Sequence, residues 1–368
     1  MLGRRSAGSQ FQQVDQKQNT NKVSGNLINP TLSNNLKLEG IDNSWTNDES
    51  RTGLGSLTLM SWQMNSQGIL QYANAEGTNP NRPNILKFPS TENMWDRYAR
   101  LMNMERNIRA VSPDILMLQS IQITEAAMLM DDIRSAGYEI RQKTLVERPN
   151  TEFLWNMILI KDKSPFQPLH SFSLEMDRKV IDDIGVLVLK NTVKGPPTLE
   201  ENADYDYYYG EDSGFGSDTN EIANLVLINI KLRSQTVGSG SSYSEIMQKA
   251  LQHVKVKLRD LKVRNYRLIL AGNFLDNPNS LQLQEIKREG FVDISFELPN
   301  PKPVTWTHPL KVPQRRSYIF IKDGIKIENF STLLLQRNWK KNSSYDNWYR
   351  AIKEGSNHFP LYFKFRIL

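Results

Sequence analysis

The chain has 368 residues, a net charge of +6 and a sequence pI near 9.2. It contains no cysteine, which excludes disulfides, thiolate zinc sites and cysteine nucleophiles. No apolar run approaches the roughly 18 residues that a membrane-spanning helix needs, so we expect no membrane insertion. The four histidines are too widely spaced for a histidine-rich metal cage.

The first part of the sequence, residues 1–56, is a polar extension. It is rich in Asn, Gln, Ser and Gly, and it has too few large apolar residues to offset the entropy of ordering. We therefore expect a tail, or an arm that lies on a partner. Arg4 and Arg5 precede the first acidic residue, Asp15, as in a mitochondrial targeting segment, with a plain tail as the alternative. On this basis we expect a mitochondrial location.

Residues 57–368 show the alternating strand and helix patterns of a mixed α/β domain. The strands are predicted at residues 57–64, 114–118, 138–144, 155–161, 172–175, 185–189, 225–232, 267–271, 317–321 and 361–367. The helices are predicted at residues 95–111, 124–136, 244–261 and 281–289, of which the second and fourth are each followed by a glycine that can cap a helix.

Two insertions interrupt this pattern. Residues 195–222 contain eight acidic residues, four tyrosines and no Lys or Arg. They are either a solvated loop or a docking strip for a basic partner. Residues 329–354 are basic and aromatic, and they are either a surface helix that buries its own tryptophans or a nucleic-acid contact. The candidate RNA-binding residues of this segment are Arg337, Trp339, Lys340, Lys341, Trp348 and Arg350.

Six short motifs follow one another at or near the ends of predicted strands. They occupy residues 60–70, 113–122, 227–232, 270–280, 316–321 and 355–361. Together they resemble the endonuclease/exonuclease/phosphatase superfamily, especially its poly(A)-specific branch with nocturnin and the Angel-type proteins. This resemblance covers residues 57–368, and it implies a four-layer sandwich of two mixed β-sheets flanked by helices.

The resemblance also implies a site for metal-assisted hydrolysis of a phosphodiester, but the residues at its positions differ. Ser120 stands where the family has a metal-binding glutamate, and Lys231 stands in place of a histidine. The other altered positions are Gln63, Asn273, Leu275, Ser317 and Asn357, whereas Asn229 and His358 match the family. We expect Asn229 to tie strand ends together and His358 to be a hydrogen-bonded core residue.

These replacements remove the anionic oxygen ligands that Mg²⁺ prefers. Carboxylates displaced by a residue or two could in principle restore a site. The nearest are Glu125, Asp276, Asp293 and Asp323. A one-residue slip on a strand sends a side chain to the opposite face, so we do not expect four such rescues together. The sequence therefore predicts no metal, no cofactor, no small-molecule substrate and no catalysis.

The leading hypothesis is a catalytically inactive structural subunit of a large ribonucleoprotein, with the mitochondrial ribosome as the first candidate. Its expected partners are RNA and other protein subunits. Two alternatives stay open: a non-catalytic RNA-binding adaptor in which Lys231 contacts phosphate, and a protein-binding subunit of another mitochondrial complex. An active magnesium-dependent phosphodiesterase or deadenylase ranks last.

Overall fold

The protein is described from a computed structural model, which covers residues 55–64, 94–147, 153–176, 181–192, 223–232, 243–274, 281–297, 304–308, 311–332, 351 and 355–368. All of these belong to one compact unit, Glu49–Leu368. Nearly all of the predicted extension 1–56 lies outside the described residues. So does the whole of the predicted acidic insertion 195–222.

The first sheet has six strands in the order β13-β14-β1-β2-β4-β3. Its strands are β1 (Leu57–Gln63), β2 (Ile115–Gln122), β3 (Tyr138–Glu147), β4 (Phe153–Lys161), β13 (Ile325–Thr332) and β14 (Leu361–Ile367). The first and last strands of the chain are neighbours, because β1 pairs antiparallel with β14 on one side and parallel with β2 on the other.

The second sheet also has six strands, in the order β5-β6-β7-β8-β12-β9. Its strands are β5 (Phe166–Leu174), β6 (Ile184–Asn191), β7 (Asn224–Lys231), β8 (Tyr266–Asn273), β9 (Val292–Asp293) and β12 (Ser317–Lys322). Strands β7 and β8 are parallel, while β8 pairs antiparallel with β12.

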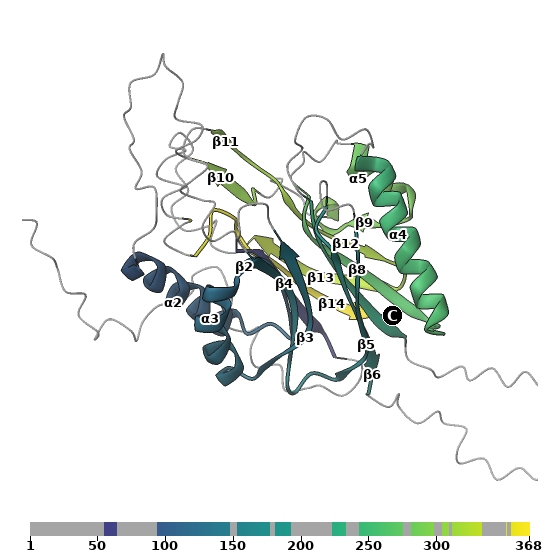
Figure 1. The fold of residues 1–368 in the computed structure, drawn as a ribbon. Helices are drawn as coiled ribbons and strands as arrows, with labels where there is room; N and C mark the ends of the chain where they lie inside the picture. The colour runs from purple at the N-terminus through teal and green to yellow at the C-terminus, as the bar shows by residue number, and fades with distance from the viewer. Residues whose placement is uncertain are drawn as a thin grey trace, which may run out of the picture. The chain divides into compact units, whose positions relative to one another are not determined.

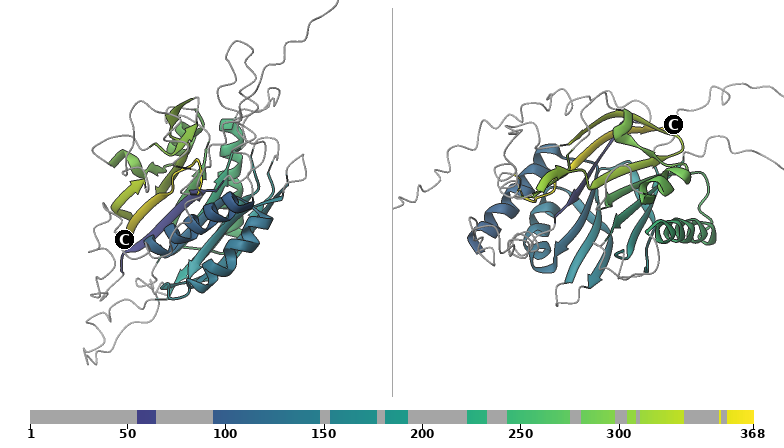
Figure 2. Two further views of the ribbon diagram at one scale, coloured as in Figure 1. Left: turned by 90° about the vertical axis from the view of Figure 1, so that its left-hand side faces the viewer. Right: turned by 90° about the horizontal axis from the view of Figure 1, so that it is seen from above.

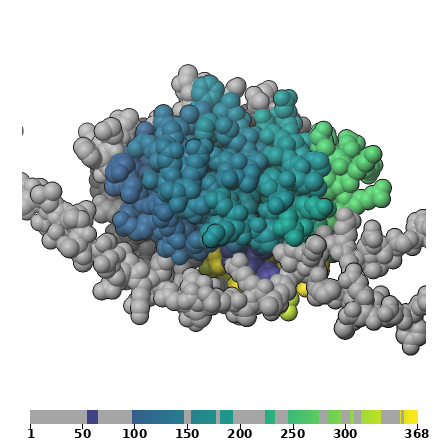
Figure 3. Space-filling model, turned by 90° about the horizontal axis from the view of Figure 1, so that it is seen from below, coloured from purple at the N-terminus to yellow at the C-terminus, as the bar shows by residue number. Residues whose placement is uncertain are grey.

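Helices cover the outer face of each sheet, which gives four layers (Figures 1 and 2). On the first sheet, α3 (Ile123–Ser135) contacts β2, β3 and β4, and α2 (Met94–Val111) packs beside α3. On the second sheet lie α4 (Tyr243–Asp260) and α5 (Leu281–Arg288). Residues 94–192, coloured blue to teal, cover most of one face, and the green region that includes α4 flanks it (Figure 3).

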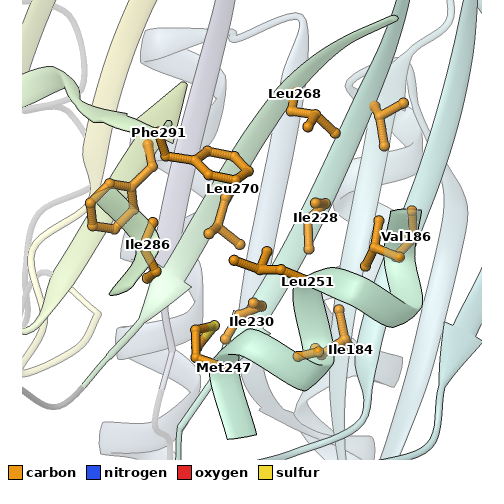
Figure 4. Packing of buried hydrophobic residues seen from close by; sticks show 14 of the residues in the cluster. Ile184, Val186, Ile228, Ile230, Met247, Leu251, Leu268, Leu270, Ile286 and Phe291 are labelled. Carbon is orange, nitrogen blue, oxygen red and sulfur yellow. The ribbon is translucent and has the colours of Figure 1, made fainter. Parts of the chain in front are cut away.

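Two large clusters of buried hydrophobic residues lie within this sandwich. One lies between the sheets and contains Leu59, Met117 and Leu227. The other lies between the second sheet and its helices, where Ile228 and Leu251 meet (Figure 4). Because successive side chains of a strand point to opposite faces, β7 supplies both layers with alternate residues. The predicted fold, a four-layer sandwich of two mixed sheets, is confirmed.

The structure corrects one predicted boundary. Strand β13 extends to Thr332 and pairs along β14, so residues 329–332 belong to a core sheet and not to an insertion. The rest of the predicted insertion lies outside the described residues, apart from the buried Ala351. Within the part of the chain that the structure describes, no helix is long and apolar enough to cross a membrane. A short hairpin of β10 (Trp306–His308) and β11 (Lys311–Gln314) was not predicted.

Candidate functional site: a polar end of the inter-sheet layer

The inter-sheet layer changes from apolar to polar at one end. In β7, Leu225 and Leu227 pack between the sheets, and the two-residue period places Asn229 and Lys231 on the same face. The same reasoning applies to residues on five more strands, all of them buried. These are Gln63 on β1, Gln119 on β2, Asn156 on β4, Asn273 on β8 and Ser317 on β12.

Strand register brings these polar residues to one place. Ser317 lies opposite Asn273, and Asn273 lies opposite Lys231. In the other sheet Gln63 lies opposite Gln119. Most of the positions that the six motifs singled out are therefore neighbours at one end of the sandwich. We call this end, which contains Gln63, Gln119, Lys231, Asn273 and Ser317, the polar pole.

Asn229 joins the two sheets at this pole. Its Oδ1 accepts a hydrogen bond from Gln119 Nε2 at 2.9 Å. Its Nδ2 lies 3.1 Å from the carbonyl oxygens of Leu118 and of Met157. Since Asn229 comes from the second sheet and all three partners come from the first, these bonds tie the sheets together. Asn229 thus makes the contacts between strand ends that the sequence predicts for it.

Lys231 forms the electrostatic centre of the site. Its side chain is 5% exposed, and its ammonium donates a hydrogen bond to Ser120 Oγ. It also lies 3.9 Å from Oδ2 of Asp182, a carboxylate that is fully buried just before β6. A buried charge needs a partner of opposite sign and hydrogen bonds, and Lys231 has both in Asp182 and Ser120. At 3.9 Å the contact with Asp182 is an ion pair without a hydrogen bond, and Asp182 Oδ2 accepts none from the residues that the structure describes.

Ser120 is presented by an unusual backbone conformation. Its φ is +55°, in the left-handed region that non-glycine residues seldom occupy. The pairing of β2 with β4 shifts register between Leu118 and Ile121, and the Ser120 amide donates instead to Asn156 Oδ1 at 2.9 Å. This local bulge turns the Ser120 hydroxyl toward Lys231.

His358 lies at the same pole and is 3% exposed. Its carbonyl accepts a hydrogen bond from Trp62 Nε1 at 2.9 Å, and it forms an isolated β-bridge with Trp306. Burial, together with the charges of Arg316 and Lys231, holds the pKa of His358 well below its usual 6.5. The imidazole is therefore neutral at physiological pH, and its Nδ1 has no hydrogen-bond partner among the residues that the structure describes. The predicted core position is confirmed, but the hydrogen bonds are made by the backbone.

Other family positions at this pole also leave buried polar atoms without a hydrogen bond in the part of the chain that the structure describes. These atoms are Gln63 Oε1, Ser317 Oγ and Asn357 Oδ1. The backbones of two of them are well anchored, because Ser356 Oγ donates to the Gln63 carbonyl at 2.7 Å and the Ser317 amide donates to Thr305 Oγ1 at 2.8 Å. Leu275, the remaining position, lies outside the described residues.

Of the four carboxylates considered as displaced ligands, the three that the structure describes are engaged elsewhere or exposed. Glu125 is buried and lies 2.6 Å from Arg100, and Asp293 lies 2.6 Å from Arg315. Asp323 is exposed in the turn between β12 and β13, and Asp276 lies outside the described residues. Among the residues that the structure describes, no group of three or more His, Asp or Glu side chains could hold a metal ion.

Sequence reasoning missed part of this site. Asp182 precedes a strand in an acidic pair with Asp183, which carries no recognisable motif. Gln119 and Asn156 read as ordinary strand residues, and their period-two position next to buried residues was the available signal. Lys231 is inside the sandwich, which disfavours the RNA contact predicted for it. The other six predicted RNA-binding residues lie outside the described residues.

No protein-family model and no curated protein matches the sequence. Solved structures do match. An endonuclease/exonuclease/phosphatase family protein from Bacteroides thetaiotaomicron is 12% identical and has a TM-score of 0.53, over 85% of this chain and 98% of that chain. ANGEL2, described as a 2′,3′-cyclic phosphatase, is 15% identical with a TM-score of 0.55, over 85% of this chain and 96% of that one. This chain has the endonuclease/exonuclease/phosphatase fold.

The human Nocturnin catalytic domain shows the same likeness, with 14% identity and a TM-score of 0.50 over 85% of this chain and 95% of that chain. At these identities the likeness concerns the fold. It confirms the architecture that the six motifs implied. What the polar pole does chemically has to be argued from its own residues.

Proposed function

We propose that this chain is a catalytically inactive protein of the endonuclease/exonuclease/phosphatase fold that serves as a structural, RNA-associated subunit of a large ribonucleoprotein. The proposed absence of catalysis rests mainly on the position of Lys231. A fixed ammonium lies at the pole, bonded to Ser120 and paired with Asp182.

Metal-assisted phosphodiester hydrolysis needs Mg²⁺ held by oxygen ligands, usually with one or two carboxylates. Amide and hydroxyl side chains at this pole bring oxygen but no negative charge. The charge of Asp182 is already compensated by Lys231, and a second cation beside that ammonium would be repelled. The Lys231 ammonium thus supplies internally the positive charge that a metal would bring.

The histidine described at this pole, His358, is not cationic. General acid–base catalysis is most efficient when a group has a pKa near the working pH. His358 has its pKa depressed by burial and by two neighbouring cations, so it stays neutral. We infer that His358 neither donates a proton to a leaving group nor stabilises developing negative charge as an imidazolium.

The basic pI of about 9.2 and the long polar N-terminal extension support association with RNA and with protein subunits. Arg4 and Arg5 at the start of the chain support a mitochondrial location and make the mitochondrial ribosome the first assembly to test. The RNA-adaptor alternative loses its main argument, because Lys231 is buried and paired.

Two measurements test the proposal. Sedimentation of native protein from mitochondrial extract should place it in a large particle that RNase treatment disrupts. A small, RNase-insensitive species would contradict the ribonucleoprotein assignment.

In the second measurement, purified protein is incubated with a short RNA and Mg²⁺ or Mn²⁺, and we expect no product above background. Hydrolysis that EDTA abolishes and that disappears in Asp182→Asn would show that the pole is catalytic.

A further inference from the structure

The outward face of α4 is strongly basic. The helix buries its apolar stripe, including Ile246, Leu251 and Val254, against the second sheet. From residue 249 to residue 264 the chain carries six Lys or Arg residues and one acid, Asp260. Five of these cations are exposed, and we call them the α4 basic patch: Lys249, Lys257, Arg259, Lys262 and Arg264.

These five cations have no acidic partner among the residues that the structure describes. The sixth cation, Lys255, differs, because it forms an ion pair with Glu289 next to α5. Exposed, unpaired like charges repel one another and contribute little to folding. Cations in the last turn of a helix do favour the helix dipole, which accounts for Lys257 and Arg259. It does not account for the three patch cations outside that turn.

The α4 basic patch lies away from the polar pole. Strands β7 and β8 end at the pole with Lys231 and Asn273, and they begin at the opposite end with Asn224 and Tyr266. Asn224 and Lys231 are seven residues apart, so the two ends of β7 are separated by about 23 Å. Because α4 leads into β8, its basic C-terminal part lies beside the strand starts (Figure 1).

We propose that the α4 basic patch binds the phosphate backbone of RNA. This inference rests on the RNA association proposed above and assigns it to the outer surface of the second sheet instead of the strand-end pole. The helical part of the patch, from Lys249 to Arg259, is about 15 Å long, and its cations are spread across the solvent-exposed side of the helix. Exposed Gln248, Gln252 and His253 lie among them and can bond to phosphate or ribose oxygens.

A membrane surface fits this face poorly. A helix that lies on a bilayer buries an apolar face in the lipid, whereas the apolar face of α4 is already buried in the core. Val256 is the one exposed large apolar side chain on the described outer face of α4. Phosphate contacts by exposed cations need no such apolar surface.

The test is fluorescence anisotropy of a labelled oligouridine, titrated with full-length protein at several salt concentrations. The patch variant carries Lys257→Gln, Arg259→Gln and Lys262→Gln. Each phosphate contact to single-stranded nucleic acid contributes about 0.7 to the slope of log affinity against log salt, so three lost contacts should reduce the slope by about 2. We expect the affinity of the variant at low salt to fall at least about tenfold.

The matched control removes three exposed cations from other surfaces, with Lys163→Gln, Lys190→Gln and Lys326→Gln. It changes the net charge equally, and we expect it to keep the wild-type slope. A second variant, Lys262→Gln with Arg264→Gln, changes only residues beyond the end of α4. It should reduce the slope by about 1.4 without altering the helix. Thermal unfolding of each variant reports on folding.

Equal losses in the patch variant and the control would reduce the effect to net charge and overturn the proposal. Unchanged RNA affinity would overturn it as well. Two further outcomes would do so by reassigning the surface. In one, the patch variant loses binding to anionic lipid vesicles but not to RNA. In the other, the variant changes only the protease sensitivity of the acidic segment 195–222, which would mean that the patch binds this segment of the same chain and not RNA. If the variant still joins an RNase-sensitive particle with wild-type affinity, only the patch assignment fails, and the proposed function stands.

Discussion

Removing the buried ammonium at the pole should destabilise the protein strongly. The variant Lys231→Met keeps the volume of the side chain but leaves the Asp182 carboxylate, which is fully buried, without its ion-pair partner. Breaking a buried pair by removing one member costs about 3–5 kcal/mol, mostly from the uncompensated charge. The Ser120 hydroxyl loses a further hydrogen bond worth about 1 kcal/mol. We expect a loss of at least about 3 kcal/mol in the free energy of unfolding.

The double variant Lys231→Met/Asp182→Asn isolates the electrostatic part. Replacing both members of a buried pair with neutral groups is often close to neutral, so most of the loss should be recovered. The double-mutant cycle should therefore give a coupling of at least about 2 kcal/mol. A matched control is Lys255→Met, whose ion pair with Glu289 is partly exposed and should be worth less than about 1 kcal/mol.

The assay is urea unfolding at neutral pH, followed by tryptophan fluorescence, with the wild-type m-value as a check that the transition is unchanged. A loss of 3 kcal/mol should also lower Tm by about 4–5 °C. If Lys231→Met costs no more than Lys255→Met, the ammonium is not a structural part of the pole. The argument that it replaces a metal ion would then fail.

Three further predictions follow from the same geometry. Since the folded protein holds His358 neutral while the unfolded chain protonates it near pH 6.5, stability should fall as pH drops below 6.5, by up to about 1.4 kcal/mol per unit. Urea unfolding at pH 5, 6 and 7 should show a shallower fall in His358→Asn, and equal slopes would contradict the assignment. Gly272 has φ +152°, and a Cβ there would lie 1.8 Å from the Ile230 carbonyl oxygen. Gly272→Ala should therefore cost on the order of 3 kcal/mol or more in urea unfolding, and a cost below 1 kcal/mol would refute this close approach. Mg²⁺ or EDTA should leave Tm of the wild type unchanged in differential scanning fluorimetry, because a ligand that binds only the folded state would raise it.

Local sequence pattern accounted for most of the regular structure. The predicted helix at residues 244–261 corresponds to α4 at Tyr243–Asp260, because a stripe of apolar residues at helical spacing has only one way to be buried. The predicted strand at residues 225–232 corresponds to β7 at Asn224–Lys231, whose central residues are buried on both faces. Apolar patterns of this length predict the type of element with little influence from the rest of the fold.

The strands that sequence reasoning missed have weak local signals. Strand β13 alternates only through Ile325 and Ile327 before a register shift, and it was partly assigned to an insertion. Strands β10 and β11 have three and four residues, and β11 contains a proline. These segments become strands because a neighbour offers backbone partners, which is a tertiary effect.

The sequence by itself determined which side chains can face a core, because this is decided by the period of each segment. It also determined which residues stand at the six motif positions. Only the tertiary structure decided how they combine. Gln119 and Asn229 are 110 positions apart in sequence, and Ser120 and Lys231 are 111 apart. Asp182 joins them from the segment just before β6. Such contacts depend on how two sheets stack and on strand register, which no local pattern encodes, so the ion pair of Lys231 with Asp182 became visible only in the folded chain.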